Sequence, residues 1–218
     1  VILHFLLVIL AALQAYLLGS INFAVILSKF FIKNDKNDVR EYGSGNAGMT
    51  NMIRVAGVLP GILTFVLDVA KGYAASYIGG NVIFGYLHKL TGDNMFLPIY
   101  GALFCGIFCV IGHIFPLYFG FRGGKAVAVS VGIFFVANWP VITVSLGIFL
   151  VMYLITRIVS VASLTATLSV AVCTIIFPVS SGKKLIIDIL TLIICAIVFL
   201  KHSENINRIV KGKEKPLV

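Results

Sequence analysis

VILHFLLVILAALQAYLL, residues 1–18, contains no Asp, Glu, Lys or Arg. It is long and apolar enough to cross a bilayer as a helix. It lacks the basic start of a signal peptide and continues directly into the sequence GSINFA, so we expect a retained first span. The whole chain of 218 residues is 60% hydrophobic and 11% charged, with a mean hydropathy of +1.06. Soluble domains are about one quarter charged. The sequence therefore predicts an all-α, polytopic membrane bundle with a single integral membrane domain over residues 1–218.

Apolar runs continue along the chain. We expect seven spans, at residues 2–28, 56–80, 96–120, 126–139, 140–157, 160–180 and 185–201. The fourth and fifth are short and are separated only by Asn138-Trp139-Pro140, so a re-entrant pair is the alternative for this segment. An odd number of spans places the termini on opposite sides of the membrane.

The basic residues predict the orientation of the bundle. Thirteen Lys and Arg fall on the side of segment 29–54 and the C-terminal tail, against three on the other side, Lys89, Lys183 and Lys184. Because positive residues accumulate in cytoplasmic loops, we expect the N-terminus outside and the C-terminus in the cytoplasm. The net charge of +9 fits this topology and an attraction to anionic lipid or phosphorylated substrates rather than to nucleic acid.

One polar segment between apolar runs, GSGNAGMTNMIR at residues 43–54, has the composition of a phosphate-binding loop. Its glycines allow close approach of the backbone, its hydroxyl and amide side chains offer donors, and Arg54 adds a planar cation. Polar, glycine-rich backbone among membrane helices is tolerated where it lines a site or leaves the bilayer. A flexible interhelical loop is the alternative, because the same residues punctuate ordinary connections.

Further polar clusters lie on the same predicted face. Gly123-Gly124-Lys125 opens the fourth span, where glycine N–H groups at a helix start would attract an anion; a helix stop with a snorkelling lysine is the alternative. Ser160 and Ser163 begin the sixth span, where they would bind substrate or only cap the helix. His202, Asn205 and Arg208 recur after the last span, with Gly212 and Glu214 nearby. Inside the second span, Asp68 and Lys71 share a helix face and predict a structural ion pair.

Other residues of types that can take part in catalysis or metal binding give weaker evidence for a functional site. His88 and Asp93 have the spacing of acyl-CoA-dependent glycerolipid acyltransferases, but they fall in an outer loop, away from every other polar cluster. Four cysteines within apolar segments predict buried small side chains, and neither a metal nor a cofactor is expected. They are Cys105, Cys109, Cys173 and Cys195. Three carboxylates, Asp35, Asp38 and Glu41, read as charge balance in a lysine-rich loop.

Taken in order along nearly the whole chain, these blocks resemble the bacterial acyl-phosphate:glycerol-3-phosphate acyltransferase family. The resemblance rests on residues 43–54, DVAKG at 68–72, GHIFP at 112–116 leading to Gly123-Gly124-Lys125, Ser160 with Ser163, and HSENI at 202–206. It implies a seven-span enzyme of the bacterial inner membrane that acylates the 1-position of glycerol 3-phosphate from a fatty acyl phosphate, at a site facing the cytoplasm. The products would be lysophosphatidic acid and phosphate, in the first acylation step of phospholipid synthesis.

The resemblance and the chemistry of two phosphorylated substrates suggest roles for individual residues. We expect direct transfer, with glycerol 3-phosphate held by Ser44, Arg54, Lys125, His202 and Asn205, and the donor phosphate held by Gly48, Thr50, Asn51 and Ser160 or Ser163. The residues expected to be catalytic are Ser44, Thr50, Asn51, Arg54 and Lys125. Those expected to bind substrate are Gly45, Asn46, Gly48, His113, Gly123, Gly124, Ser160, Ser163, His202 and Asn205. The acyl chain is expected between spans, beside Phe115, Phe119 and Phe121.

Two other classes fit part of the pattern. An organophosphate or anion transporter would also place broken helices and cations near phosphate, but its site would lie near the midplane, whereas these polar residues gather at one face. A scaffolding membrane protein would leave the costly inward polar residues without a purpose.

Overall fold

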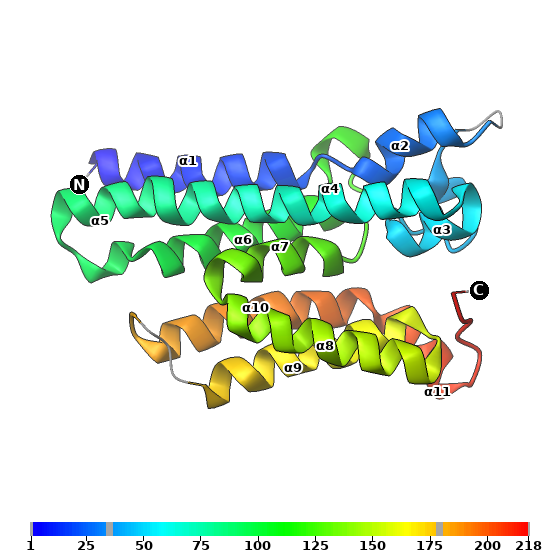
Figure 1. Cartoon of the computed structure of the whole chain (residues 1–218). Helices are drawn as coiled ribbons and strands as arrows, with labels where there is room; N and C mark the ends of the chain where they lie inside the picture. Colours follow the sequence, from blue (N-terminus) through cyan, green and yellow to red (C-terminus); the bar gives the residue numbers. More distant parts are fainter. Residues whose placement is uncertain (1, 34–36, 178–180, 218) are drawn as a thin grey trace.

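In the computed structural model, residues 2–33, 37–177 and 181–217 are described, and among them the regular elements are all helices. Asp35 and Lys36, which contribute to the predicted charge pattern, lie outside these ranges. Figure 1 shows an elongated bundle in two layers, with the two ends of the chain at opposite ends of the bundle. The all-α fold is therefore as predicted.

The first layer contains the N-terminal half of the chain. It is built from α1 (Ile2–Gly19), α4 (Val58–Tyr77), α6 (Pro98–Ile114) and α7 (Val127–Ala137). A π-helical segment, η2 (Ile78–Phe84), carries α4 on into α5 (Gly85–Thr91), and the turn η3 (Asn94–Phe96) leads to α6. The second layer contains α8 (Trp139–Thr156), α9 (Val159–Ile176) and α10 (Lys184–Lys201), and α10 contacts α6 to join the layers.

Helix length gives a smaller number of spans than the apolar runs do. Within the described ranges, five stretches are long and apolar enough to cross a membrane, at 2–31, 58–91, 98–119, 139–156 and 159–176. A sixth is available if α10 and α11 (Ser203–Val210), bent by 59°, count as one. The remaining apolar helix, α7, has 11 residues, and its length of about 17 Å is short of a hydrocarbon core of about 30 Å. Seven complete crossings therefore remain a prediction.

The short helix α7 is held by close packing against α4. A Cβ on Gly72 would lie 2.2 Å from the carbonyl oxygen of Val129, and one on Gly132 would lie 2.0 Å from that of Val69. Small residues of this kind let helix backbones approach within a membrane. At the other end of α7, Asn138 accepts a hydrogen bond from Val141 N–H and Pro140 occupies the first turn of α8. The predicted break at 138–140 is confirmed as a helix-to-helix turn.

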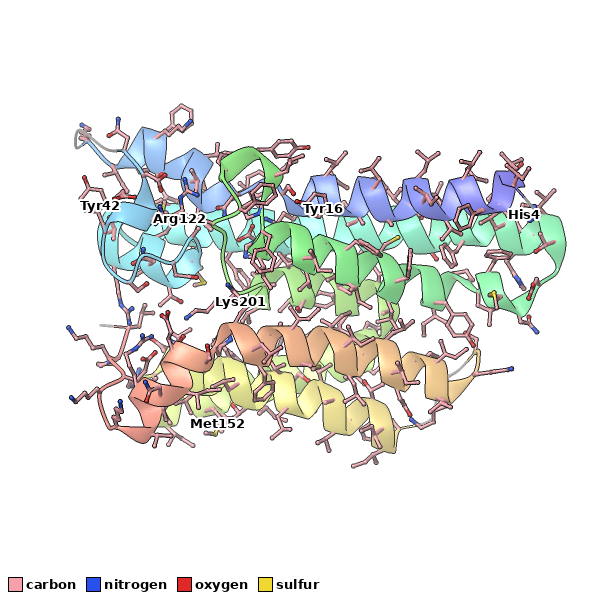
Figure 2. The ribbon with its side chains drawn as sticks, turned by 180° about the vertical axis from the view of Figure 1, so that it is seen from behind. His4, Tyr16, Tyr42, Arg122, Met152 and Lys201 are labelled. Atoms are coloured by element: carbon pink, nitrogen blue, oxygen red, sulfur yellow. The ribbon has the colours of Figure 1, made fainter. Side chains whose placement is uncertain are left out.

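The polar segments gather at one end of the bundle, the end near the C-terminus in Figure 1. Here lie α2 (Phe23–Phe31), α3 (Met49–Ala56) and α11, with the short turns η1 (Val39–Glu41) and η4 (Leu117–Phe119). Tyr42 and Arg122 lie at this end in Figure 2, and His4 at the other. We call these the polar end and the distal end. Long helices that follow one another along the chain run in opposite directions (Figure 1), which is why loops far apart in sequence meet at the polar end.

Candidate functional site

A cavity of about 550 Å³ opens at the polar end. It brings together eleven of the predicted site residues. They are Ser44, Asn46, Gly48, Thr50, Arg54, His113, Lys125, Ser160, Ser163, His202 and Asn205. They come from five separate parts of the chain. The convergence of these segments, which the sequence could only suggest, is the main property of the site.

The 43–54 loop owes its shape to Asn51. Its Oδ1 accepts a hydrogen bond from the Ser44 backbone N–H, at 2.8 Å, and its Nδ2 donates to the carbonyl oxygens of Val39 and Tyr42. Gly43 adopts a positive φ of 61°, and a Cβ there would lie 2.3 Å from Asn51 Oδ1. Asn51 is fully buried and does not line the cavity. It shapes the loop instead of facing the substrate, which differs from the direct role predicted for it.

The two glycines before Lys125 differ from the prediction in a similar way. Gly123 N–H donates to the Ile114 carbonyl and Gly124 N–H to the His113 carbonyl, so neither is free for an anion. The helix itself begins at Val127, after Ala126 in the left-handed conformation. A Cβ on Gly124 would lie 2.3 Å from His113 Nε2. The glycines therefore allow this turn to lie directly on His113, and Lys125 is carried to the cavity by the turn.

Gly45 is also absent from the cavity wall. It has a positive φ of 69° and donates its N–H to the Tyr42 carbonyl. Of the predicted site residues, Gly45, Asn51, Gly123 and Gly124 thus build the surrounding loops.

Glu214 in the C-terminal tail organises the opposite wall. Its carboxylate accepts hydrogen bonds from Ser160 Oγ at 2.7 Å, from Asn205 Nδ2 at 2.5 Å and from Arg208 Nε at 2.5 Å. Burial alone would raise the pKa of Glu214, but these donors and the charge of Arg208 outweigh it and lower the pKa below its ordinary value. The sequence grouped Glu214 with the last polar cluster and gave it no role. Its only signal is a single carboxylate in the lysine-rich segment KGKEK.

Lys125 connects the two walls. Its Nζ donates to Asn205 Oδ1, so the Asn205 amide bridges Lys125 and Glu214. Burial and the neighbouring charge of Arg208 lower the pKa of Lys125 to about 8, with Glu214 and Glu204 opposing this shift. A lysine in this state has lost part of its hydration and gains from a bound anion.

The tail also closes over Arg54. One guanidinium nitrogen of Arg54, Nη2, donates to the carbonyl oxygens of Lys215 and Pro216, at 3.3 and 3.0 Å. The backbone N–H of Leu217 donates to the Arg157 carbonyl. Lys213 and Lys215 line the cavity mouth, so segment 213–217 forms part of its rim.

A buried ionic cluster lies behind the cavity. Lys71 Nζ lies 2.7 Å from Asp68 Oδ1, which confirms the predicted ion pair, and 2.9 Å from His113 Nδ1. Asp68 and His113 both reach the cavity wall.

The remaining wall is apolar and comes from the helices. It is lined by Phe65, Val127, Val131, Leu146 and Phe149. Four of these, all but Phe65, also line a smaller adjoining cavity between α7, α8, α9 and α10. The predicted lining by Phe115, Phe119 and Phe121 is wrong. Phe115 lies under the Lys201 ammonium, Phe119 packs against the cluster around Val39, and Phe121 is 54% exposed.

The His88/Asp93 pair lies far from this cavity, at the distal end. His88 Nδ1 lies 2.9 Å from the Asp93 carbonyl oxygen, and the Asp93 carboxylate accepts from Met95 N–H. Within the described residues, no group of three or more His, Cys, Asp or Glu is arranged to hold a metal ion.

Comparison with known proteins gives a consistent result. The sequence model of a family described as "Glycerol-3-phosphate acyltransferase" matches residues 9–212. A protein of that name from Finegoldia magna is 35% identical over 214 residues, covering 98% of each chain. "Glycerol-3-phosphate acyltransferase 2" of Bacillus anthracis is 36% identical and covers 96% of this chain and 99% of its own.

Two solved structures have the same fold. Both are described as crystal structures of PlsY (YgiH), "an integral membrane glycerol 3-phosphate acyltransferase", one in a glycerol 3-phosphate form and one in a lysophosphatidic acid form. They superpose on this chain with TM-scores of 0.79 and 0.77, at 33% identity, and the matches cover 96% of this chain and 94% of theirs.

Proposed function

This chain belongs to the glycerol-3-phosphate acyltransferase family, and on that premise we propose that it transfers a fatty acyl group from acyl phosphate to the 1-position of glycerol 3-phosphate. The products are lysophosphatidic acid and inorganic phosphate. The enzyme lies in the bacterial inner membrane, and its cavity faces the cytoplasm. Crystal forms of a family member with glycerol 3-phosphate and with lysophosphatidic acid support the acceptor and the product.

The observation that carries this proposal is the division of the cavity into a cationic part and an apolar part. The cationic side chains that line it are Arg54, Lys125, Arg208, Lys213 and Lys215, and the carboxylates are Asp68 and Glu214. Asp68 is already paired with Lys71. The remaining positive charge suits two phosphorylated substrates, and the apolar wall suits a hydrocarbon chain.

The acceptor is placed by Ser44, Arg54, Lys125, His202 and Asn205. A bound phosphate would stabilise the charged form of Lys125. Asn205 is held in one orientation because its amide oxygen accepts from Lys125 and its amide nitrogen donates to Glu214. The donor phosphate is held by Gly48, Thr50 and Ser160 or Ser163, with Asn51 keeping their loop in shape. Holding both substrates in reacting geometry contributes much of the rate acceleration.

Transfer is direct. The glycerol hydroxyl attacks the acyl carbonyl carbon, the bond from that carbon to the phosphate oxygen breaks, and the hydroxyl proton leaves on the phosphate. Acyl phosphate already has a good leaving group, so an enzyme nucleophile is unnecessary. Ser160 donates a hydrogen bond to the Glu214 carboxylate but is poorly activated by it, because the lowered pKa of Glu214 makes it a weak base.

The donor is tested with the purified protein. We expect product from glycerol 3-phosphate and fatty acyl phosphate, and none from glycerol 3-phosphate and acyl-CoA. Activity with acyl-CoA alone would refute the proposed donor, and a covalent acyl group trapped on Ser44 or Thr50 would refute direct transfer.

The cytoplasmic orientation needs a separate measurement. A cysteine introduced at Lys213, on the rim of the cavity, should react with a membrane-impermeant maleimide in inverted but not in right-side-out vesicles. The matched position is Lys183 at the distal end, which should show the opposite pattern. The reverse labelling would overturn the proposed topology.

A further inference from the structure

Two histidines line the cavity, and the group beside each Nδ1 differs. His202 Nδ1 lies 2.8 Å from the carbonyl oxygen of Val198, which can only accept a hydrogen bond. His202 therefore carries a proton on Nδ1. His113 Nδ1 lies 2.9 Å from Lys71 Nζ, and an ammonium can only donate. His113 therefore accepts at Nδ1 and, as a neutral imidazole, carries its proton on Nε2.

The surroundings of Lys71 fix this arrangement. Lys71 Nζ forms an ion pair with Asp68 Oδ1 at 2.7 Å, donates to the Ile21 carbonyl oxygen at 2.6 Å and lies 2.9 Å from His113 Nδ1. Asp68 Oδ1 is 3.7 Å from His113 Nδ1, and this distance is too long for Asp68 Oδ1 to accept a hydrogen bond from that nitrogen. A second positive charge on His113 beside the Lys71 ammonium would be repelled.

The Nε2 side of His113 packs against the turn that carries Lys125 to the cavity. His113 is 3% exposed, and Nε2 makes no hydrogen bond to any described residue. Nε2 lies against Gly124, where a Cβ would be 2.3 Å away, and His113 lines the cavity. Gly124 stands directly before Lys125 and three residues before Val127 of the apolar wall. His113 thus borders the place where a phosphate-binding surface meets a hydrocarbon-binding surface.

In an acyl phosphate the group between phosphate and hydrocarbon is the carbonyl. We infer that His113 is a catalytic hydrogen-bond donor whose Nε2–H stabilises the negative charge that develops on the acyl carbonyl oxygen, and that the Asp68–Lys71 pair is a positioning device that holds His113 in the required tautomer. His113 keeps its proton throughout. The glycerol oxygen forms the bond to the carbonyl carbon, and the phosphate departs with the hydroxyl proton, as in the proposed function on which this inference rests.

Kinetics of isosteric variants test the donor. Gln places an amide nitrogen near the position of Nε2, whereas Asn places one near Nδ1. We expect His113→Gln to keep roughly a tenth of the wild-type kcat and His113→Asn and His113→Leu to lose roughly 10²–10³-fold, the usual effect of removing an oxyanion donor. KM for glycerol 3-phosphate should stay within about twofold in all three, because the charge arises only in the transition state. A higher KM with unchanged kcat, or equal activity of the Gln and Asn variants, would overturn the assignment.

The positioning device has its own variant. Replacing a buried ion pair by apolar residues of similar size is often neutral for stability. Asp68→Leu/Lys71→Met should therefore fold, with an unchanged elution volume, but lose kcat at constant KM because the His113 tautomer is no longer fixed. Wild-type kcat in the folded double variant would overturn the role of the pair.

Nitrogen NMR tests the tautomer without any change at the site. His4 and His88 lie at the distal end, and the His4→Gln/His88→Gln enzyme, labelled with ring ¹⁵N histidine, retains two histidine spin systems. We expect one neutral ring protonated at Nε2 and one protonated at Nδ1. Two rings of the same kind would overturn the inference. Because this measurement needs no substrate, its result is independent of whether acyl phosphate is the donor.

Discussion

At the polar end of the bundle, Lys125, Asn205 and Glu214 form a hydrogen-bonded chain between residues that are 80 and 9 positions apart in the sequence. At the distal end, His88 and Asp93 interact within one exposed turn, over 5 positions. The distal end has a hollow of its own, about 1050 Å³, lined in part by Asp93, Tyr100 and Lys183. Neither a recognisable residue pair nor a large hollow distinguishes the ends. The difference is that distant segments at the polar end bury and orient one another's charges.

Replacing a lysine at each end gives the largest expected contrast. We expect Lys125→Ala to lower kcat/KM by roughly 10²–10³-fold, because a buried cation that meets substrate charge is removed. Lys183→Ala, at the distal hollow, should retain wild-type activity. Both are measured as lysophosphatidic acid release, with elution volume as the control for folding. Similar losses in both variants would mean that the two ends do not differ as argued.

A pair of glutamates tests how far the polar end depends on its tail. Glu214→Gln removes the charge that pairs with Arg208 and orients Asn205, and we expect KM for glycerol 3-phosphate to rise roughly tenfold, near the low end for a charge-assisted hydrogen bond. Glu204→Gln is the matched control. The Glu204 side chain is 88% exposed, and its carboxylate comes no closer than 3.9 Å to the Arg208 guanidinium, so this ion pair is weak. A lower KM for Glu214→Gln would show instead that this carboxylate competes with the substrate phosphate.

Much of the polar end could be predicted, because the signals that begin and end its helices lie within a few residues of one another in the sequence. Apolar runs that end in Gly, Ser or Asn determine where helices stop, and alternation of direction brings every second helix end to the same face. Ser44, Thr50 and Lys125 were accordingly found on one cavity. The all-α membrane fold followed from the same runs.

The sequence could not predict side-chain hydrogen bonds whose partners depend on tertiary packing. Asn51 belongs to a polar run typical of ligand binding, yet its side chain turns inward to hold the loop. Glu214 stands in a tail that has the composition of a solvated segment, and its role depends on a contact with Ser160, 54 residues away. The apolar lining of the cavity was assigned to the wrong aromatic residues, since Phe65 and Phe149, which do line it, lie within helices with no distinguishing pattern.

The pH dependence provides a smaller effect that is specific to the polar end. Burial lowers the pKa of Lys125 to about 8, so the ammonium that we propose as a phosphate ligand is lost as the pH rises through that value. Since one pH unit is a tenfold change in the ratio of the two forms, kcat/KM for glycerol 3-phosphate should fall about fourfold by pH 8.5. Lys125→Arg, whose guanidinium stays charged, should remove this fall whatever its absolute rate. An unchanged profile in that variant would assign the titration to another group.

The smallest effect is expected where the sequence shows the most familiar catalytic spacing. His88→Ala and Asp93→Ala should each keep activity within about twofold, because their hydrogen bonds are to the backbone of their own turn, the Asp93 side chain is exposed and His88 is half-buried. Asp93→Ala removes a cap from the turn at Asn94–Phe96 and should cost about 1 kcal/mol of stability, visible as a slightly lower Tm. Activity of both variants is measured with acyl phosphate and with acyl-CoA. A loss of tenfold or more with either donor would place chemistry at the distal end. The sequence spacing of His88 and Asp93 would then identify the active site better than the buried cluster of distant segments at the polar end does.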